Sequence, residues 1–385
     1  MKRVCVVTGS RAEYGLLRPL MREIENDPEL EAGLLVTGTH LSPDHGLTVQ
    51  EIERDGFPIA ERIEIVLSSD TRVGACKMVG LAFISFGEAL ARLAPDLVVG
   101  LGDRFELFAA VGAAHLSGIP VAHIHGGEVT AGAFDDALRH SITKMSHLHF
   151  TSTEAYRNRV IQLGEDPERV FNVGALGLDA IRTVSPIARG ELESSLGIRF
   201  GARNLLVTYH PVTLEHRTAG SQVDALLAEL EARTDTTIIF TGANADPQGR
   251  EVNARLRAFA ARHPDRSTFV ENLGQQRYFS VLAQVDAVVG NSSSGLIEAS
   301  SFHVGTINIG DRQKGRVAAS SVIHCAAKRD AIAQAFERLY SREFQEALPG
   351  VVNPYGDGHA AERIKRALKT ACTGRLKKGF YDLLP

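Results

Sequence analysis

The chain has 385 residues, 44% of them hydrophobic and 23% charged, and this composition excludes a disordered or fibrous protein. The 42 basic and 46 acidic residues are interspersed and give a formal net charge of −4, so we do not expect a nucleic acid as the partner. The length exceeds what one hydrophobic core usually serves, which predicts two domains.

The cysteines and the apolar runs indicate in which compartment we expect the protein. Cys5, Cys76, Cys325 and Cys372 lie far apart and form no C-x-x-C pair, which favours a reduced, cytoplasmic protein. The apolar run at the N-terminus is too short for a signal peptide, and we see no run that approaches the ~20 apolar residues of a membrane span. We therefore expect no membrane partner.

Short runs of Val, Ile and Leu alternate with longer segments of helical spacing, which predicts an α/β protein with parallel sheets covered by helices on both faces. In the first half of the chain, the spacing of apolar residues predicts helices that include residues 79–93 and 105–115. Its predicted strands are Val4–Val7, Gly33–Val36, Arg62–Val66, Leu97–Gly100, Val121–Ile124 and His149–Thr151.

A turn-rich stretch around Gly174, Gly177 and Pro186 marks the predicted domain boundary, after which the pattern restarts. The second half predicts helices at 222–233 and 249–262, and strands at Asn204–Thr208, Thr236–Phe240, Ser267–Val270, Asp286–Gly290 and Gly305–Ile309. We thus predict two Rossmann-like, doubly wound domains over residues 1–182 and 183–360, followed by a C-terminal helix within 361–385. Ligands of such sheets bind beyond the carboxyl ends of the strands.

Phosphate-binding groups follow the first predicted strand and two strands of the second half. Thr8-Gly9-Ser10-Arg11 leads into a helix, where backbone N–H groups and Arg11 can receive a phosphate; a plain turn with a solvated Arg11 is the alternative. This segment is not G-x-G-x-x-G, so a dinucleotide cofactor has no support. Ser292 and Ser293 open a predicted helix that carries Glu298, and they can cap that helix or bind a diphosphate. Arg312 belongs to a basic turn that can neutralise phosphate or stay solvated.

Acidic and histidine residues follow the fourth and fifth predicted strands and open the next helix. Asp103, Glu128 and the pair Asp135-Asp136 are candidates for proton transfer, because carboxylates that converge in an enclosed site beside cations can have pKa values near neutrality. Helix capping is the alternative for each aspartate alone.

Histidines at alternate positions raise the question of a metal site. His123 and His125, and likewise His147 and His149, would each share one face of a strand, but no third ligand stands at a recognisable spacing, so we predict no metal. For His147 and His149 we expect buried or hydrogen-bonded side chains instead. His210 follows the first strand of the second half and would face a cleft if the two domains face each other.

Seven separated motifs, in one order over nearly the whole chain, resemble those of hydrolysing UDP-N-acetylglucosamine 2-epimerases of the bacterial sialic-acid pathway. The motifs are Thr8-Gly9-Ser10-Arg11-Ala12-Glu13-Tyr14, Gly102-Asp103-Arg104, His123-Ile124-His125-Gly126-Gly127-Glu128, Asp135-Asp136-x-x-Arg139-His140, His210-Pro211, Gly290-Asn291-Ser292-Ser293-Ser294-Gly295 and Gly310-Asp311-Arg312-Gln313.

The resemblance implies two domains of the glycosyltransferase-B type facing a cleft, a C-terminal helix that crosses back onto the first domain, and a homodimer. It implies conversion of UDP-N-acetylglucosamine and water to N-acetylmannosamine and UDP without a cofactor. By motif, the contacts to UDP and substrate fall on Arg11, Arg104, His210, Asn244, Ser292, Ser293, Glu298 and Arg312. The chemical groups fall on Asp103, Asp135 and Asp136, with His210 as a further candidate.

One position departs from the family pattern. Many relatives have a glutamate where this chain has His125. Either His125 takes over its proton transfer, or Glu128, three residues on, reaches the sugar, or the second step of the reaction proceeds differently.

The expected chemistry removes the proton from C2 as the diphosphate leaves, which gives a glycal that water then attacks. Three alternatives stay open: the same reaction on a UDP-2,4-diacetamido-trideoxyhexose of the legionaminic acid pathway, a retaining glycosyltransferase of the same fold, and a silent sugar-nucleotide sensor. The acidic cluster argues against transfer, and the presence of Asp103, Glu128 and Asp136 argues against a sensor.

Overall fold

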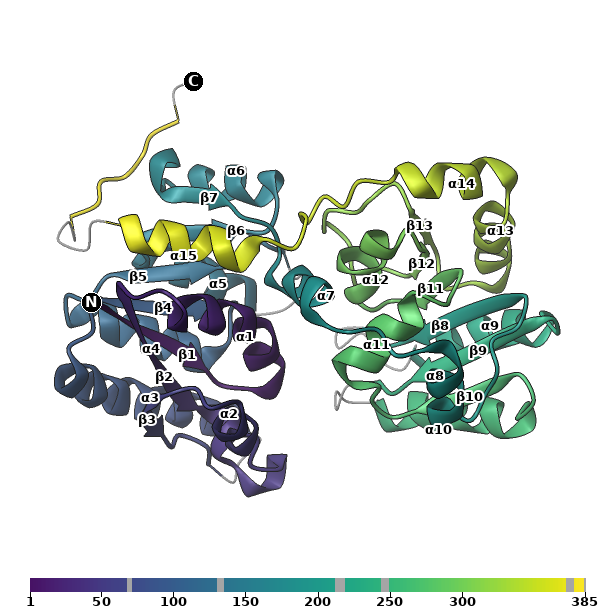
Figure 1. Ribbon diagram of the computed structural model, residues 1–385, viewed down its shortest axis with the longest axis horizontal. Helices are drawn as coiled ribbons and strands as arrows, with labels where there is room; N and C mark the ends of the chain where they lie inside the picture. The colour runs from purple at the N-terminus through teal and green to yellow at the C-terminus, as the bar shows by residue number, and fades with distance from the viewer. Residues whose placement is uncertain (68–70, 130–134, 212–218, 244–248, 372–376, 384–385) are drawn as a thin grey trace. The chain divides into compact units, whose positions relative to one another are not determined.

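The computed structural model describes all residues except 68–70, 130–134, 212–218, 244–248, 372–376 and 384–385 (Figure 1). The chain divides into two compact units. The first unit comprises Met1–Ala180 and Tyr355–Pro385, and the second comprises Ile181–Pro354. The last segment of the chain therefore belongs to the unit in which the chain begins.

The first unit contains a parallel sheet with the strand order β3-β2-β1-β4-β5-β6-β7. Its strands are β1 (Lys2–Thr8), β2 (Leu30–Thr37), β3 (Ile59–Ile63), β4 (Leu97–Leu101), β5 (Val121–Ile124), β6 (Leu148–Thr151) and β7 (Val170–Asn172). In β1, Val4 and Val6 enter one hydrophobic core while Cys5 and Val7 enter another, because successive side chains of a strand point to opposite faces.

Helices cover both faces of this sheet. The helices α1 (Arg11–Glu25), α2 (Val49–Asp55) and α15 (Ala360–Thr370) contribute to the core on one face. The helices α3 (Arg72–Leu93), α4 (Phe105–Leu116) and α5 (Asp135–Met145) contribute to the core on the other. The remaining helices of this part are α6 (Glu154–Gln162) and α7 (Asp179–Thr183), which continues into the second unit.

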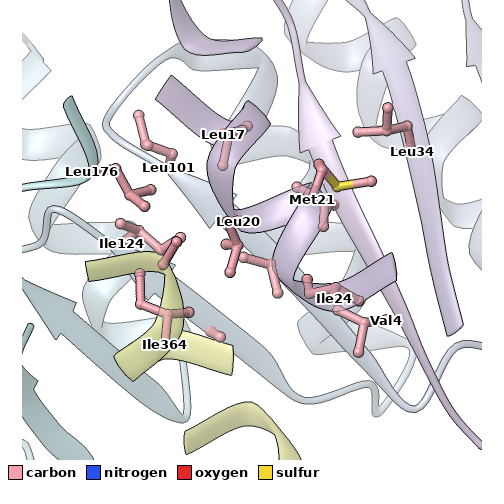
Figure 2. Packing of buried hydrophobic residues seen from close by; sticks show 14 of the residues in the cluster. Val4, Leu17, Leu20, Met21, Ile24, Leu34, Leu101, Ile124, Leu176 and Ile364 are labelled. Carbon is pink, nitrogen blue, oxygen red and sulfur yellow. The ribbon is translucent and has the colours of Figure 1, made fainter. Parts of the chain in front are cut away.

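The helix α15 is fastened to the first unit by its apolar side and by both ends. Figure 2 shows Ile364 of α15 beside Leu20 of α1 in the hydrophobic core. The carboxylate of Asp179 accepts the first N–H groups of the helix, from Ala360 at 3.0 Å and Ala361 at 2.6 Å. At the other end, the Lys2 ammonium donates to the carbonyl of Leu368 and to two carbonyls beyond it. Each charge has the sign that complements the helix dipole.

The second unit contains a second parallel sheet, in the order β10-β9-β8-β11-β12-β13. Its strands are β8 (Arg203–Thr208), β9 (Thr236–Thr241), β10 (Ser267–Val270), β11 (Ala287–Gly290), β12 (Gly305–Ile309) and β13 (Val322–Cys325). Its helices are α8 (Arg189–Leu196), α9 (Ala219–Glu231), α10 (Gly249–Arg262), α11 (Gly274–Leu282), α12 (Ser294–Ile297), α13 (Arg329–Leu339) and α14 (Arg342–Ala347). The predicted fold class, two doubly wound Rossmann-like domains, is confirmed.

Several predicted elements are misplaced or were missed. The strand predicted at 62–66 is β3, which ends at Ile63 because pairing with β2 stops there. The strands β7 and β13 lie at sheet edges and are too short for a clear pattern. The helix predicted at 79–93 begins earlier, at Arg72, where the Thr71 hydroxyl accepts the Gly74 N–H.

The expectation about membrane spans is also wrong in one respect. Among the described residues, the one helix long and apolar enough to cross a membrane is α3, and 28% of its most apolar window is buried in the protein. Small and polar residues, among them Gly and Ser, interrupt its apolar residues, so the sequence of this helix does not form one continuous apolar run.

Candidate active site

Each sheet has one point at which the strand order reverses, between β1 and β4 in the first unit and between β8 and β11 in the second. At such a point the chain leaves two neighbouring strands in opposite directions and opens a crevice beyond their carboxyl ends. The loops at these two points contain five of the predicted site residues, namely Asp103, Arg104, His210, Ser292 and Ser293.

In the first unit, Arg139 of α5 connects the predicted acid–base residues. Its side chain is buried, forms an ion pair with Asp103 after β4, and donates to the carbonyl of His125 after β5 at 3.0 Å. The carboxylate of Glu128 lies 3.9 Å from the Arg139 guanidinium. The alternative in which Asp103 caps α4 is not observed, because the residue at the N-cap position is Arg104 and no side chain caps that end.

His125 lies outside the strand that the sequence places it in. The strand β5 ends at Ile124, and His125 has a φ of 63°, in the left-handed region that a residue with a side chain rarely adopts. Its Nδ1 lies 3.5 Å from Glu128 Oε1, which also accepts a hydrogen bond from Ser152 at 2.8 Å. The prediction that His125 shares a strand face with His123 is therefore wrong, and His125 instead lies beside Glu128.

The two aspartates at the start of α5 have different neighbours. Asp135 is one helical turn before Arg139, and Asp136 is one turn before His140, on the next side of the helix. Burial raises the pKa of Asp135, and the negative charge of Asp103 raises it further. Burial lowers the pKa of His140, and the negative charge of Asp136 opposes this effect in part. Of the pair, Asp135 is thus the carboxyl held toward the protonated form beside a second aspartate.

A second group of buried acids lies under the loop after β1. Arg104 donates to Glu106 at 2.7 Å, and the backbone N–H of Gly9 donates to Glu13 at 2.9 Å. Burial raises the pKa of Glu13 to about 7. The sequence motifs assign no site role to Glu13 or Glu106, although the Ser10-x-x-Glu13 spacing is a capping-box signal that locates Glu13 at the start of α1.

Arg11 and the histidines of the first unit have structural partners. Arg11 is the first residue of α1, and its exposed guanidinium pairs with Glu51 at 3.0 Å. His123 bonds Thr143 at 3.0 Å and the carbonyl of Gly102 at 2.7 Å, and burial lowers its pKa to about 3. His147 and His149 are buried and hydrogen-bonded, as predicted. Within the described ranges, no group of three or more His, Cys, Asp or Glu side chains could hold a metal ion.

In the second unit, His210 and Asn291 join the two loops at the reversal point. The Asn291 side chain accepts from the backbone N–H of His210 and donates to its carbonyl, both at 2.7 Å. The carbonyl of Asn291 accepts from Arg312 at 3.1 Å and from Gln313 at 2.9 Å. Burial lowers the pKa of His210 to about 4, with a contribution from the charge of Arg312, so the imidazole is neutral at pH 7. This network brings together two predicted UDP contacts, His210 and Arg312.

The serine-rich loop differs from its prediction. The helix α12 has only four residues and ends before Glu298, and no side chain caps it at Ser293. Ser292 and Ser293 are half-buried, and the Ser292 hydroxyl accepts the N–H of Ser294, the first residue of α12, at 3.4 Å. The Ser294 hydroxyl bonds the hydroxyl of Tyr278. Burial raises the pKa of Glu298, and its Oε2 has no hydrogen-bond partner in the described part of the chain. This oxygen can accept a hydrogen bond from a hydroxyl group of a ligand. Asn244 lies outside the described residues.

Comparisons with known proteins agree with the motifs. The family model described as UDP-N-acetylglucosamine 2-epimerase matches residues 22–369. A GDP/UDP-N,N′-diacetylbacillosamine 2-epimerase (hydrolyzing) of Campylobacter jejuni is 41% identical over 99% of both chains. The polysialic acid biosynthesis protein P7 of Escherichia coli is 37% identical over 100% of this chain and 98% of its own. A UDP-N,N′-diacetylbacillosamine 2-epimerase (hydrolyzing) of Legionella pneumophila is 35% identical over 96% of both.

The fold agrees as well. The crystal structure of a putative UDP-N-acetylglucosamine 2-epimerase from Listeria monocytogenes matches 96% of each chain with a TM-score of 0.81 and 22% identity, which shows the shared glycosyltransferase-B fold. The family model covers most of the chain, and three relatives exceed 30% identity over nearly all of it. The chain therefore belongs to the UDP-N-acetylglucosamine 2-epimerase family and is a hydrolysing nucleotide-sugar 2-epimerase.

Proposed function

We propose that this enzyme hydrolyses UDP-N,N′-diacetylbacillosamine and inverts its C2, releasing UDP and 2,4-diacetamido-2,4,6-trideoxymannose. The observation that supports the reaction type is the cluster of Asp103, Glu128 and Asp135 around the buried Arg139. The observation that supports the sugar is the 41% identity to a relative named for the GDP or UDP form of N,N′-diacetylbacillosamine. The 35% identity to a relative named for the UDP form alone supports the nucleotide. This substrate replaces UDP-N-acetylglucosamine, which the motifs alone favour.

The residues of the first unit suit the proton transfers. In the first step the C2–H bond and the C1–O bond break, the proton passes to a base, and UDP leaves with the bonding electrons. In the second step water adds its hydroxyl to C1 and gives its other proton to a base, while an acid donates a proton to C2 from the opposite face. We assign the base to Asp103, whose ion pair with Arg139 holds it in place. We assign the acid to Asp135, because burial and the charge of Asp103 raise its pKa.

The residues of the second unit suit the leaving group. Negative charge develops on the diphosphate as the C1–O bond breaks, and a fixed cation and donor stabilise it without reorganisation. Arg312 is fixed by its bond to the Asn291 carbonyl, and the loop containing His210 is fixed by the Asn291 side chain. The accepting oxygen of Glu298 suits a ribose hydroxyl.

The second candidate substrate is UDP-N-acetylglucosamine, which the identity to protein P7 and the family description favour. The two sugars differ at C4, which carries an acetamido or a hydroxyl group, and at C6. A pocket that hydrogen-bonds one group strongly rejects the analogue that lacks it, whereas a pocket that tolerates both discriminates weakly.

The deciding experiment incubates the enzyme with each UDP-sugar separately in deuterium oxide and follows UDP release and the product by NMR. We expect a higher kcat/KM for UDP-N,N′-diacetylbacillosamine and a product with deuterium at C2. A higher kcat/KM for UDP-N-acetylglucosamine would overturn the substrate, and protium at C2 would overturn elimination. The variants D103N and D135N should bind UDP in a thermal-shift assay but lose at least ~10²-fold in kcat.

A further inference from the structure

Two buried carboxyl groups to which the motifs assign no role share one enclosed place in the first unit. Glu13 is in the first turn of α1 and Glu106 is in the first turn of α4. A Cβ at Gly9 would lie 3.4 Å from Glu13 Oε2 and 3.6 Å from Glu106 Oε1, so both carboxyls converge on the loop after β1. The turn after β2 closes a third side, since a Cβ at Gly38 would lie 3.0 Å from Glu106 Oε1.

The charges around these two acids do not balance if both are ionised. Among the described residues, the cation that pairs with them is Arg104, which donates to Glu106 at 2.7 Å and whose charge also acts on Glu13. Arg11, on the same loop, pairs instead with an acid of α2. Burial lowers the pKa of His40, on the turn after β2, to about 4, so its imidazole is neutral at pH 7. Ionisation of both acids would therefore leave one negative charge in excess in a poorly solvated place.

The surroundings of the two acids favour different forms of the carboxyl. Glu106 is in direct contact with the guanidinium of Arg104, which favours the carboxylate. Glu13 accepts the N–H of Gly9 at 2.9 Å, and burial, together with the charge of Glu106, raises its pKa to about 7. When two carboxyls share an enclosed site, the second ionises against the charge of the first. The proton therefore belongs on Glu13.

A proton on Glu13 also supplies a hydrogen-bond donor next to a buried acceptor. Glu106 Oε2 is buried and has no hydrogen-bond partner in the described part of the chain. A buried acceptor without a donor is destabilising, and a carboxylic acid has an O–H that a carboxylate has not. The unpartnered oxygen is thus an observation, independent of the charges, that favours one protonated acid in this place.

We propose that Glu13 and Glu106 hold one negative charge between them, Glu13 as the acid and Glu106 as the carboxylate, and that this pair positions Arg104 for the substrate. The Arg104 side chain is 39% exposed beyond the carboxyl end of β4 and follows Asp103, the residue assigned as the base. A long side chain that is fixed in advance loses less conformational freedom when a substrate binds. The proposal rests on the predicted contact of Arg104 with the substrate, which the kinetic experiment tests separately.

The pair also makes substrate binding depend on pH. Above about pH 7, Glu13 loses its proton, and a second negative charge then competes for Arg104 and repels an anionic substrate. The variant E13Q keeps an oxygen that can accept the Gly9 N–H and, like the acid, carries no charge at any pH. It therefore fixes the pair in its neutral-pH form.

Thermal unfolding tests the shared charge without any substrate. Glu13 ionises near pH 4.5 in the unfolded chain and near pH 7 in the folded chain, so the stability of the wild type should fall as the pH rises between these values. We expect the melting temperature of E13Q, relative to wild type, to rise by at least ~3 °C between pH 5 and 8.5. The control E53Q removes a half-exposed carboxylate of α2 and should show no such change. A difference between E13Q and wild type that is the same at both pH values overturns the shared charge.

Steady-state kinetics tests the positioning, with whichever of the two UDP-sugars the enzyme hydrolyses faster. Between pH 6.5 and 8.5 we expect KM to rise about threefold or more in wild type relative to E13Q. At pH 6.5, E106Q should raise KM about tenfold or more and change kcat by less than about threefold, because Arg104 keeps its charge and loses its fixed position. In the background of R104A, E106Q should raise KM by less than about twofold.

Each kinetic result either supports or overturns the positioning. R104A without an effect on KM would refute the predicted contact with the substrate. E106Q that raises KM by its full factor in the background of R104A would show that Glu106 does not act through Arg104. A KM with the same pH dependence in wild type and E13Q would separate the pair from substrate binding. The comparison of E13Q with wild type does not depend on whether E106Q folds, and the choice of UDP-sugar decides the proposed substrate independently.

Discussion

Replacing Arg139 by alanine tests the central element of the acid–base site. The Arg139 side chain is 5% exposed and pairs with Asp103, whose side chain is 21% exposed. Removal of one partner from a buried ion pair costs about 3–5 kcal/mol, because the other charge stays in a poorly solvated place. Since Asp103 retains some contact with water, we expect the lower end, a loss of about 3 kcal/mol in the free energy of unfolding. The surface pair of Arg342 and Glu346, with side chains 90% and 63% exposed, provides the control. R342A should cost less than about 0.5 kcal/mol.

The assay is urea unfolding followed by far-UV circular dichroism, together with the rate of UDP release. The two units need not unfold together, so hydrogen exchange at the His125 amide, which donates to the Phe150 carbonyl at 2.7 Å, reports the first unit separately. The double variant D103N/R139M should cost less than the two single variants added, by at least about 1 kcal/mol.

The same variant has a functional consequence that a purely structural arginine would not have. The charge of Arg139 lowers the pKa of Asp135 against the effects of burial and of Asp103. In R139K, which retains the charge, the pH dependence of kcat should stay near that of wild type, whereas in R139A the alkaline limb that reports the acid should move to higher pH. Equal stability of R139A and R342A, or additive losses in the double variant, would refute the reasoning.

Three further results are expected. At Gly290, φ is 135° and a Cβ would lie 1.9 Å from the backbone oxygen of Thr208. We therefore expect G290A to lower the free energy of unfolding in urea by at least ~3 kcal/mol. A neutral result would contradict the tight contact between β8 and β11. Lys378 donates to Glu165 at 2.8 Å, so K378A should lower the free energy of unfolding by about 2 kcal/mol. K377A, at an exposed position, should change it by less than ~0.5 kcal/mol. Equal losses in the two variants would show that Lys378 does not anchor the C-terminal segment. Burial lowers the pKa of His123 to about 3, so below pH 6.5 the unfolded chain binds a proton at this residue that the folded chain does not bind. The free energy of unfolding should therefore fall by about 2 kcal/mol between pH 7 and 5. H123N should abolish that part of the pH dependence, and an unchanged dependence would place the titration at another residue.

The sequence by itself determined the fold class and the positions of the candidate site residues relative to the strands. Buried strands of a parallel sheet read as unbroken apolar runs, so most central strands are located to within a residue or two, as at Asn204–Thr208 and Gly305–Ile309. Polar motifs that interrupt these runs mark strand ends, which is why Asp103, His210 and Asn291 lie in the loops at the two reversal points.

Only the tertiary structure decided which of these residues meet. The spacing along α5 does not distinguish Asp135 from Asp136. The fold places Asp103 close enough to Asp135 for its charge to raise the pKa of that carboxyl. The role of Arg139 is equally invisible in the sequence, because its partners lie 36 and 14 residues away on other elements. Periodicity reports the burial of a residue relative to its own helix or strand, whereas ion pairs and pKa shifts depend on which elements become neighbours in the fold.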